Sequence, residues 1–208
     1  MIAGLMQKRQ LQIIDILKFA ARAHPSVEIV SRRIDEPISR YGYRTLFKRV
    51  SQVAHALQEL GVRSGDRVAT LAWNTNRHLE MFYAVPGTSA VLHTVNPRLS
   101  DDHIVYIVNH GESRVLAFEK SFLPLVARLR ERFTHVKTFI LMSDIGSVGP
   151  EEAADAICYE EMLAGRSETF DWPDIDENVG ALLCYTSGTT GDPKGVLYSH
   201  RSIVIHAL

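Results

Sequence analysis

The chain has 208 residues, of which 46% are hydrophobic and 23% are charged, and its formal net charge is −1. This composition favours a packed core and argues against intrinsic disorder. Lysine and arginine are spread along the chain without a basic stripe, so we expect no nucleic-acid partner. No stretch reaches the ~18 apolar residues of a transmembrane helix. Peripheral membrane contact stays open.

Cysteine and histidine usage gives no sign of a metal site. Cys158 and Cys184 do not form a CxxC pair, and the nine histidines are scattered. Residues 1–25 carry polar side chains inside their apolar part, which suits an amphipathic helix better than a signal peptide. We therefore expect a cytoplasmic protein, with a mitochondrial leader as the alternative.

Strand and helix patterns alternate in the first part of the chain. Residues 27–33 and 36–43 are rich in β-forming side chains and predict a pair of strands. The apolar period becomes helical from Thr45, and Gly61 is suited to end this helix in the left-handed conformation. The apolar run 67–73 predicts a buried strand.

The same alternation continues as far as residue 142. Pro86 is expected to kink or end one helix, and Ser100 is a good N-cap for the next, which should stop at Gly111. The predicted elements are helix 76–89, strand 90–96, helix 101–110, strand 114–119, helix 121–133 and strand 136–142. Strands separated by helices predict an α/β fold with a doubly wound, mostly parallel sheet flanked by helices.

Residues 143–178 differ from the rest because they are acidic and rich in glycine and proline. We predict a surface connector with one short helix around YEEML, and interpret its acidity as solvation. The connector divides the chain into an N-terminal subdomain, 1–178, and the start of a second subdomain, 179–208.

The sequence YTSGTTGDPKG, residues 185–195, lies between two extended segments. Glycines let backbone N–H groups approach an anion, hydroxyls add rotatable donors, and Lys194 adds a mobile positive charge. The candidate phosphate-binding residues are Thr186, Ser187, Gly188, Thr189, Thr190, Gly191 and Lys194.

Two other interpretations of this loop are weaker. Pro193 stands where the nucleotide-binding motif GxxxxGK requires a glycine, which argues against a kinase or GTPase loop. A disordered linker seldom lies between two apolar strands. The sequence therefore predicts a strand–loop–strand unit that holds phosphate.

Residues 185–195 resemble the phosphate-binding signature of adenylate-forming enzymes, which include acyl-CoA synthetases, adenylation domains of peptide synthetases and firefly luciferase. The sequence HTVNPR, residues 93–98, is similar to medium- and long-chain fatty acyl-CoA synthetases. The resemblance extends from about residue 12 to residue 208.

This resemblance implies a two-step reaction: a carboxylate attacks MgATP to give an acyl-adenylate and pyrophosphate, and coenzyme A then takes the acyl group. ATP, Mg²⁺ and coenzyme A are the implied cofactors, and a fatty acid or other carboxylate is the implied substrate. Residues 186–191 would cradle the β- and γ-phosphates, and Lys194 would act catalytically by neutralising the leaving group. His200 would contact substrate or be structural, whereas His93 is expected to be a packed histidine.

The family's adenine-binding segment, metal-binding glutamate and C-terminal domain have no counterpart in these 208 residues. We expect the chain alone to be inactive and residues beyond about 140 to be poorly supported, with exposed sheet edges. The leading hypothesis is the N-terminal portion of a fatty acid–CoA ligase, either truncated or completed by a C-terminal chain. The alternatives are an adenylation domain that loads a carrier protein and a non-catalytic interaction module.

Overall fold

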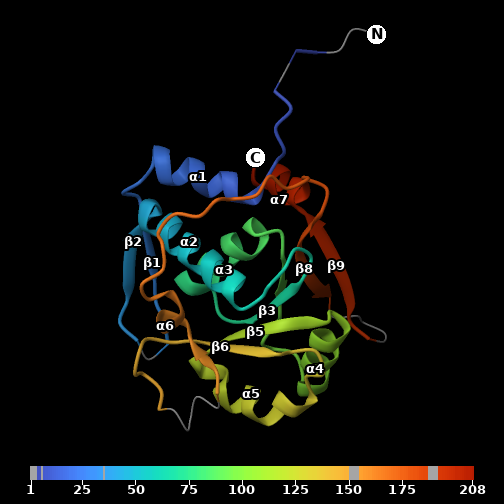
Figure 1. Cartoon of the computed structure of the whole chain (residues 1–208). Coiled ribbons are helices and arrows are strands. Elements are labelled where there is room, and N and C mark those ends of the chain that lie inside the picture. Colours follow the sequence, from blue (N-terminus) through green and yellow to red (C-terminus); the bar gives the residue numbers. More distant parts are fainter. Residues whose placement is uncertain (1–3, 6, 35, 150–154, 187–191) are drawn as a thin grey trace.

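The computed structural model describes residues 4–5, 7–34, 36–149, 155–186 and 192–208. Its centre is a seven-stranded sheet in the order β7-β6-β5-β3-β4-β8-β9 (Figure 1). Neighbouring strands are parallel except β8 and β9, which are antiparallel. The strands are β3 (Arg67–Leu71), β4 (Val91–Thr94), β5 (Ser113–Glu119), β6 (Thr138–Met142), β7 (Ile157–Cys158), β8 (Gly180–Thr186) and β9 (Lys194–Ser199). The predicted mostly parallel α/β sheet is confirmed.

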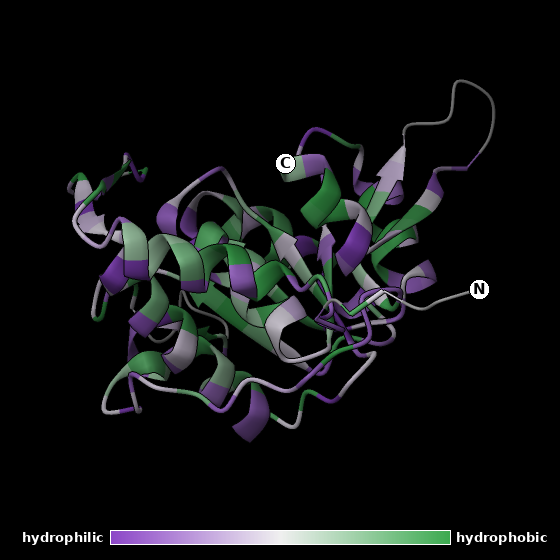
Figure 2. Ribbon diagram, turned by 90° about the horizontal axis from the view of Figure 1, so that it is seen from above, coloured by the Kyte–Doolittle hydropathy of each residue, from purple (hydrophilic) through white to green (hydrophobic). Residues whose placement is uncertain are grey.

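Helices cover both faces of the sheet, which makes the fold doubly wound (Figure 1). On one face lie α2 (Tyr43–Glu59), α3 (Asn76–Gly87) and α6 (Tyr159–Leu163), with α1 (Ile13–Ala23) packed outside them. On the other face lie α4 (Asp101–His110) and α5 (Leu123–Leu129). Figure 2 shows the hydrophobic residues on the central strands and on the inner sides of the helices. Each face therefore has its own core.

The helix ends follow local sequence signals. Ser100 Oγ accepts a hydrogen bond from the backbone N–H of His103 at 3.4 Å, so the predicted N-cap of α4 is confirmed. Gly61 has φ +75° just beyond α2, as the predicted left-handed cap requires. The helix predicted over 121–133 is broken into α5 and two flanking 3₁₀ turns. Pro124 lies in the first turn of α5, where its missing N–H needs no partner.

A small two-stranded ribbon stands beside α3. Its strands, β1 (Glu28–Ser31) and β2 (Ser39–Gly42), pair antiparallel and confirm the predicted strand pair. The Oγ atom of Ser31 accepts a hydrogen bond from the backbone N–H of Asn76 at 3.0 Å. This bond ties the ribbon to the first residue of α3.

The described part of 143–178 lies largely at the surface, as the sequence predicts, but it also contributes to the sheet and the core. It adds β7 to the sheet, and Tyr159, the first residue of its helix α6, is completely buried. Further along, Trp172 packs so closely on α3 that a Cβ built on Gly87 would lie 2.6 Å from its ring. The predicted short helix exists, and its residues Tyr159, Met162 and Leu163 belong to the core on the side of α2 and α3.

Buried charges also join this segment to the helices. Arg77, only 2% exposed, donates from Nε to Oε1 of Glu160 at 2.9 Å. Arg49 donates to Glu160 at 2.9 Å and to the fully buried Glu80 at 2.7 Å. Buried charges are tolerated when they are paired in this way. The acidity of the segment is therefore not only solvation, because Glu160 is part of this ionic network.

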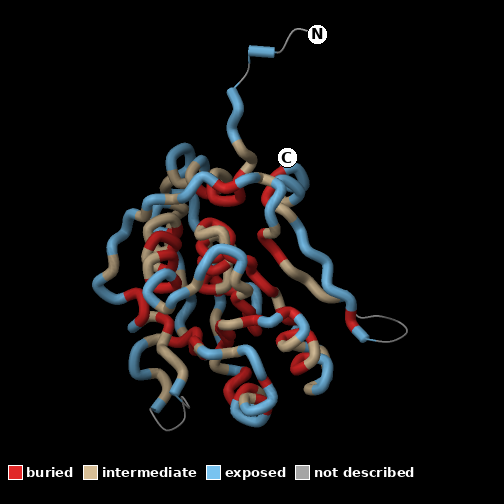
Figure 3. Tube along the Cα trace, turned by 45° about the vertical axis from the view of Figure 1, so that its right-hand side comes forward, coloured by how far each residue is buried: buried red, intermediate tan, exposed pale blue. Residues whose placement is uncertain are grey.

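Residues 179–208 are built into the same structure. Strand β8 lies between β4 and β9, and α7 (His200–Ala207) packs against α1. The expectation of a poorly supported tail is therefore wrong for the described residues. Residues 179–208 share one sheet with the preceding strands, and the subdomain boundary at residue 178 stays a prediction. The expected exposed edge is present: Leu197 on β9 is 59% exposed, and Figure 3 shows β9 almost entirely in the exposed class.

Candidate functional site

The predicted phosphate-binding loop joins β8 to β9. These strands form an antiparallel hairpin in which Thr186 is opposite Lys194 and Tyr185 is opposite Gly195. The predicted strand–loop–strand arrangement is confirmed for the described residues. Thr186 and Lys194 therefore stand together at the mouth of the hairpin. The other five predicted residues, Ser187, Gly188, Thr189, Thr190 and Gly191, lie outside the described residues.

The mouth of the hairpin opens at the rim formed by the carboxyl ends of the parallel strands. Strand β8 runs parallel to β4, and β4 runs parallel to β3, so Thr186 lies at the same rim as Thr94. The hydroxyl of Thr94 is 3.2 Å from Sγ of Cys184, which holds the ends of β4 and β8 together. Open α/β sheets bind their ligands at this rim.

The charge at the mouth suits an anion. Lys194 is exposed, and its ammonium group makes no ion pair with any residue that the structure describes. The hydroxyl of Thr186 donates to the backbone oxygen of Lys194 at 3.4 Å, a long bond that a stronger acceptor can replace. Pro193 is buried and fixes the backbone immediately before Lys194. The described part of the mouth thus offers an exposed ammonium group and a hydroxyl donor, both of which can bind phosphate, near the exposed carboxylate of Asp192.

His200 follows β9 and begins α7. It is fully buried, and its Nδ1 atom accepts a hydrogen bond from the backbone N–H of Ile13, the first residue of α1, at 3.3 Å. Burial lowers the pKa of His200. Its Nε2 atom has no hydrogen-bond partner among the described residues. In this structure His200 joins α7 to α1, and a contact with substrate stays a prediction.

His93 is the packed histidine that the sequence predicts. It is fully buried on β4, and its Nδ1 atom is 2.9 Å from the hydroxyl of Ser113 on β5. Burial, with a smaller effect of the Arg67 charge, lowers its pKa to about 4. His93 is therefore a neutral side chain at neutral pH.

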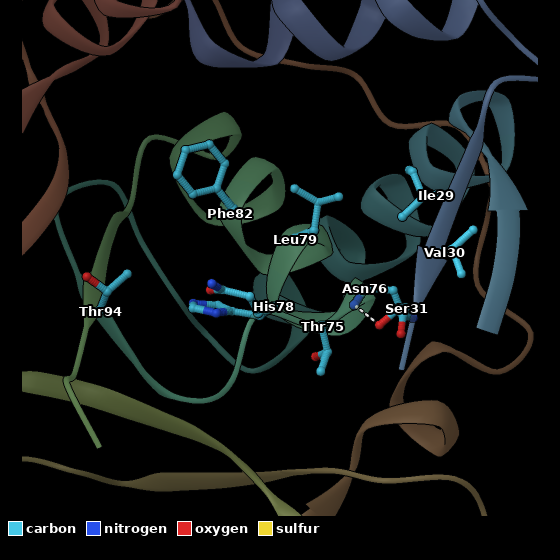
Figure 4. A pocket seen from close by; sticks show the side chains of 10 residues that line it. Ile29, Val30, Ser31, Thr75, Asn76, His78, Leu79, Phe82 and Thr94 are labelled. Atoms are coloured by element: carbon cyan, nitrogen blue, oxygen red, sulfur yellow. Dashed lines mark hydrogen bonds between the residues drawn. The ribbon is translucent and has the colours of Figure 1, made fainter. Parts of the chain in front are cut away.

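A cavity of about 530 Å³ lies at the same rim, between β1 and α3 (Figure 4). Apolar side chains from both elements line it, among them Ile29, Leu79 and Phe82, and Thr94 lies on its far side. His78 also lines it, and burial lowers the pKa of this histidine. No local sequence pattern indicates this cavity, because β1 is brought to α3 only by the tertiary fold.

Other kinds of site find less support. The described residues contain no group of three or more histidine, cysteine, aspartate or glutamate side chains that could bind a metal ion. None of the helices in the described part of the chain combines the length and apolar content needed to cross a bilayer.

The structure thus defines a doubly wound α/β protein in which the β8–β9 hairpin brings Thr186 and Lys194 to the carboxyl rim of the sheet. A family model described as AMP-binding enzyme matches residues 17–208, and the chain belongs to this family. The chain corresponds to the N-terminal part of medium- and long-chain fatty acid–CoA ligases within the adenylate-forming superfamily.

Several characterised relatives are CoA ligases. The chain is 44% identical over 204 residues to 3-methylmercaptopropionyl-CoA ligase of Ruegeria lacuscaerulensis, covering 98% of this chain and 38% of that protein. It is 42% identical over 205 residues to the medium-chain-fatty-acid–CoA ligase of Ectopseudomonas oleovorans, covering 99% of this chain and 38% of the relative. It is also 42% identical over 203 residues to the long-chain-fatty-acid–CoA ligase of Thermus thermophilus, covering 98% of this chain and 36% of that ligase. The chain therefore spans little more than a third of the length of these relatives.

Solved structures support the fold. A long-chain-fatty-acid-CoA ligase from Archaeoglobus fulgidus superposes with a TM-score of 0.82 at 21% identity, covering 97% of this chain and 39% of that chain. Acetoacetyl-CoA synthetase from Streptomyces lividans gives the same TM-score, covering 94% of this chain and 31% of that synthetase. At this level of identity the likeness shows the fold alone.

Proposed function

We propose that this chain is the N-terminal part of an ATP-dependent fatty acid–CoA ligase and that its hairpin holds the β- and γ-phosphates of ATP. One observation carries the proposal. The signature at 185–195 includes Thr186 and Lys194, which are opposite each other at the carboxyl rim of the sheet, and the exposed Lys194 has no ion-pair partner among the described residues.

ATP supplies the adenylyl group in this proposal, and the chain binds and orients its phosphates. The ammonium group of Lys194 balances the charge that develops on pyrophosphate, and the hydroxyl of Thr186 donates to a phosphate oxygen. Ser187, Gly188, Thr189, Thr190 and Gly191 belong to the proposal on sequence grounds alone. The donor set at the mouth suits phosphate, whereas Mg²⁺ is assigned to no described residue.

The names of the relatives favour coenzyme A as the acyl acceptor. The three relatives compared above are CoA ligases, and they are matched along nearly the whole of this chain. The alternative of an adenylation domain that loads a carrier protein has no comparable support. A fatty acid is the proposed carboxylate because two of these ligases act on medium- or long-chain fatty acids.

The proposal is tested by calorimetric titration of the 208-residue chain with inorganic pyrophosphate. Replacing Lys194 by Ala should weaken binding about thirtyfold, the effect of losing one charge-assisted contact of about 2 kcal/mol. The matched control is Lys137→Ala, which removes an exposed lysine at the start of β6. Equal affinities for the two variants, or no binding by the unmodified chain, would contradict the proposed phosphate site.

A further inference from the structure

Tyr185, the residue before Thr186, is held from the side by α4. Its hydroxyl is 2.6 Å from Nδ1 of His110, and the two rings meet edge to face with centroids 5.8 Å apart. Burial raises the pKa of Tyr185, so its hydroxyl stays protonated at neutral pH. Tyr106, one turn earlier on α4, stacks on His110 at 5.3 Å and restricts the rotation of the imidazole.

The ring of Tyr185 also controls how the hairpin closes. Tyr185 pairs with Gly195 across the ladder, and a Cβ built on Gly195 would lie 3.2 Å from Cζ of the tyrosine. The absence of a side chain at Gly195 therefore lets the ring lie across the ladder. The next pair along the ladder is Thr186 and Lys194. A displacement of the ring would change the backbone at both residues of the mouth.

A second histidine supports the ring from within the sheet. The rings of His93 and Tyr185 have centroids 5.2 Å apart. His93 is fully buried and hydrogen-bonded to Ser113, so it forms a fixed surface on that side. Tyr185 thus has a rigid support beneath it and one polar anchor, His110, at its hydroxyl.

We propose that His110 is a positioning residue for the phosphate-binding hairpin: by holding the hydroxyl of Tyr185, it fixes Thr186 and Lys194 relative to each other. This inference rests on the proposed function of the hairpin. Because His110 is exposed, its hydrogen bond adds little to global stability, and its effect falls on the hairpin itself.

The first test follows hydrogen exchange at the backbone amides of residues 185, 186, 194 and 195 in the chain without ligand. His110→Phe and Tyr185→Phe should each speed exchange there about fivefold, the effect of one lost hydrogen bond, while amides of β5 and β6 stay unchanged. His110→Asn places an amide oxygen near the position of Nδ1 and should restore slow exchange. His103→Phe, an exposed histidine on the same helix, is the matched control. Equal exchange in His110→Phe and His103→Phe would overturn the proposal.

The second test measures pyrophosphate affinity in the same variants. His110→Phe should bind pyrophosphate about tenfold more weakly than the unmodified chain. Adding Tyr185→Phe should weaken binding no further, because the two changes break the same hydrogen bond. His110→Asn should bind almost normally. Unchanged affinity in His110→Phe would overturn the positioning role and leave the proposed function intact. If the unmodified chain binds no pyrophosphate, the proposed function fails, and the exchange measurement alone decides whether His110 orders the hairpin.

Discussion

The Nε atom of Arg77 donates a hydrogen bond to Oε1 of Glu160 at 2.9 Å, although the two residues are 83 positions apart in the sequence. Arg77 is almost completely buried, and Glu160 is the second residue of α6. This contact explains why a segment that is acidic and rich in glycine and proline still folds onto α3.

Replacing Glu160 by Ala should destabilise the fold strongly. The change removes the acceptor shared by Arg77 and Arg49. Among the described residues, Arg77 then keeps only Glu36 and Asp144 as carboxylate partners, and Arg49 keeps only Glu80. We expect a loss of about 3 kcal/mol in the free energy of unfolding, measured by urea denaturation. Glu161→Ala is the control, because Glu161 is exposed and adjacent. Similar stability of the two variants would show that the ionic network does not hold α6.

Replacing Gly87 by Ala should displace Trp172. A Cβ at this position would lie 2.6 Å from the indole ring of Trp172. Because this distance is too short for two non-bonded carbon atoms, the ring has to shift. We expect a loss of about 2 kcal/mol from overpacking, with a red shift of Trp172 fluorescence in a Trp73→Phe background. Gly149→Ala serves as control because a Cβ there meets no atom within 4 Å. An unshifted spectrum in Gly87→Ala would refute the packing.

Protonation of His93 should oppose folding. Its folded pKa is lowered from 6.5 to about 4, so between these values the unfolded chain binds more protons than the folded chain. The contribution of the neutral His93 to the free energy of unfolding is therefore complete above about pH 6.5. It is lost as the pH falls towards 4, by about 3 kcal/mol in total. Unfolding measured at several pH values should show a shallower decline in His93→Gln. Parallel curves for both proteins would argue against a neutral His93.

The chain alone should show no ATP–pyrophosphate exchange with fatty acids of any length. Pyrophosphate binding at the mouth, by itself, does not place the α-phosphorus next to a carboxylate, and such placement is a large part of the catalytic effect. The assay uses radiolabelled pyrophosphate and a full-length relative as the positive control. Exchange well above background would show that these 208 residues contain a working adenylation site.

Local signals predicted much of the fold and part of the site. The N-cap at Ser100 and the left-handed Gly61 depend on a few neighbouring residues, so the sequence shows them directly. The signature at 185–195 predicts Thr186 and Lys194 as phosphate-binding residues; the structure shows them opposite each other, and their binding of phosphate stays a prediction.

Contacts between distant segments could not be predicted in the same way. Nothing near Glu160 in the sequence indicates Arg77, and acidic residues in a glycine- and proline-rich stretch are usually solvated. The bond between His110 and Tyr185 joins residues 75 positions apart. Such pairs depend on which strands become neighbours, and this choice is made by packing of the whole core.

The position of β8 has a consequence for biosynthesis. Its partner β4 is finished 90 residues earlier, as the contact between Thr94 and Cys184 shows. At about 5–20 residues per second, the ribosome leaves β4 without this neighbour for roughly 5–20 seconds. During that interval the nascent chain carries an open strand that chaperones or other unfinished chains can capture. Pairing of β8 with β4 thus closes this open edge of the nascent sheet.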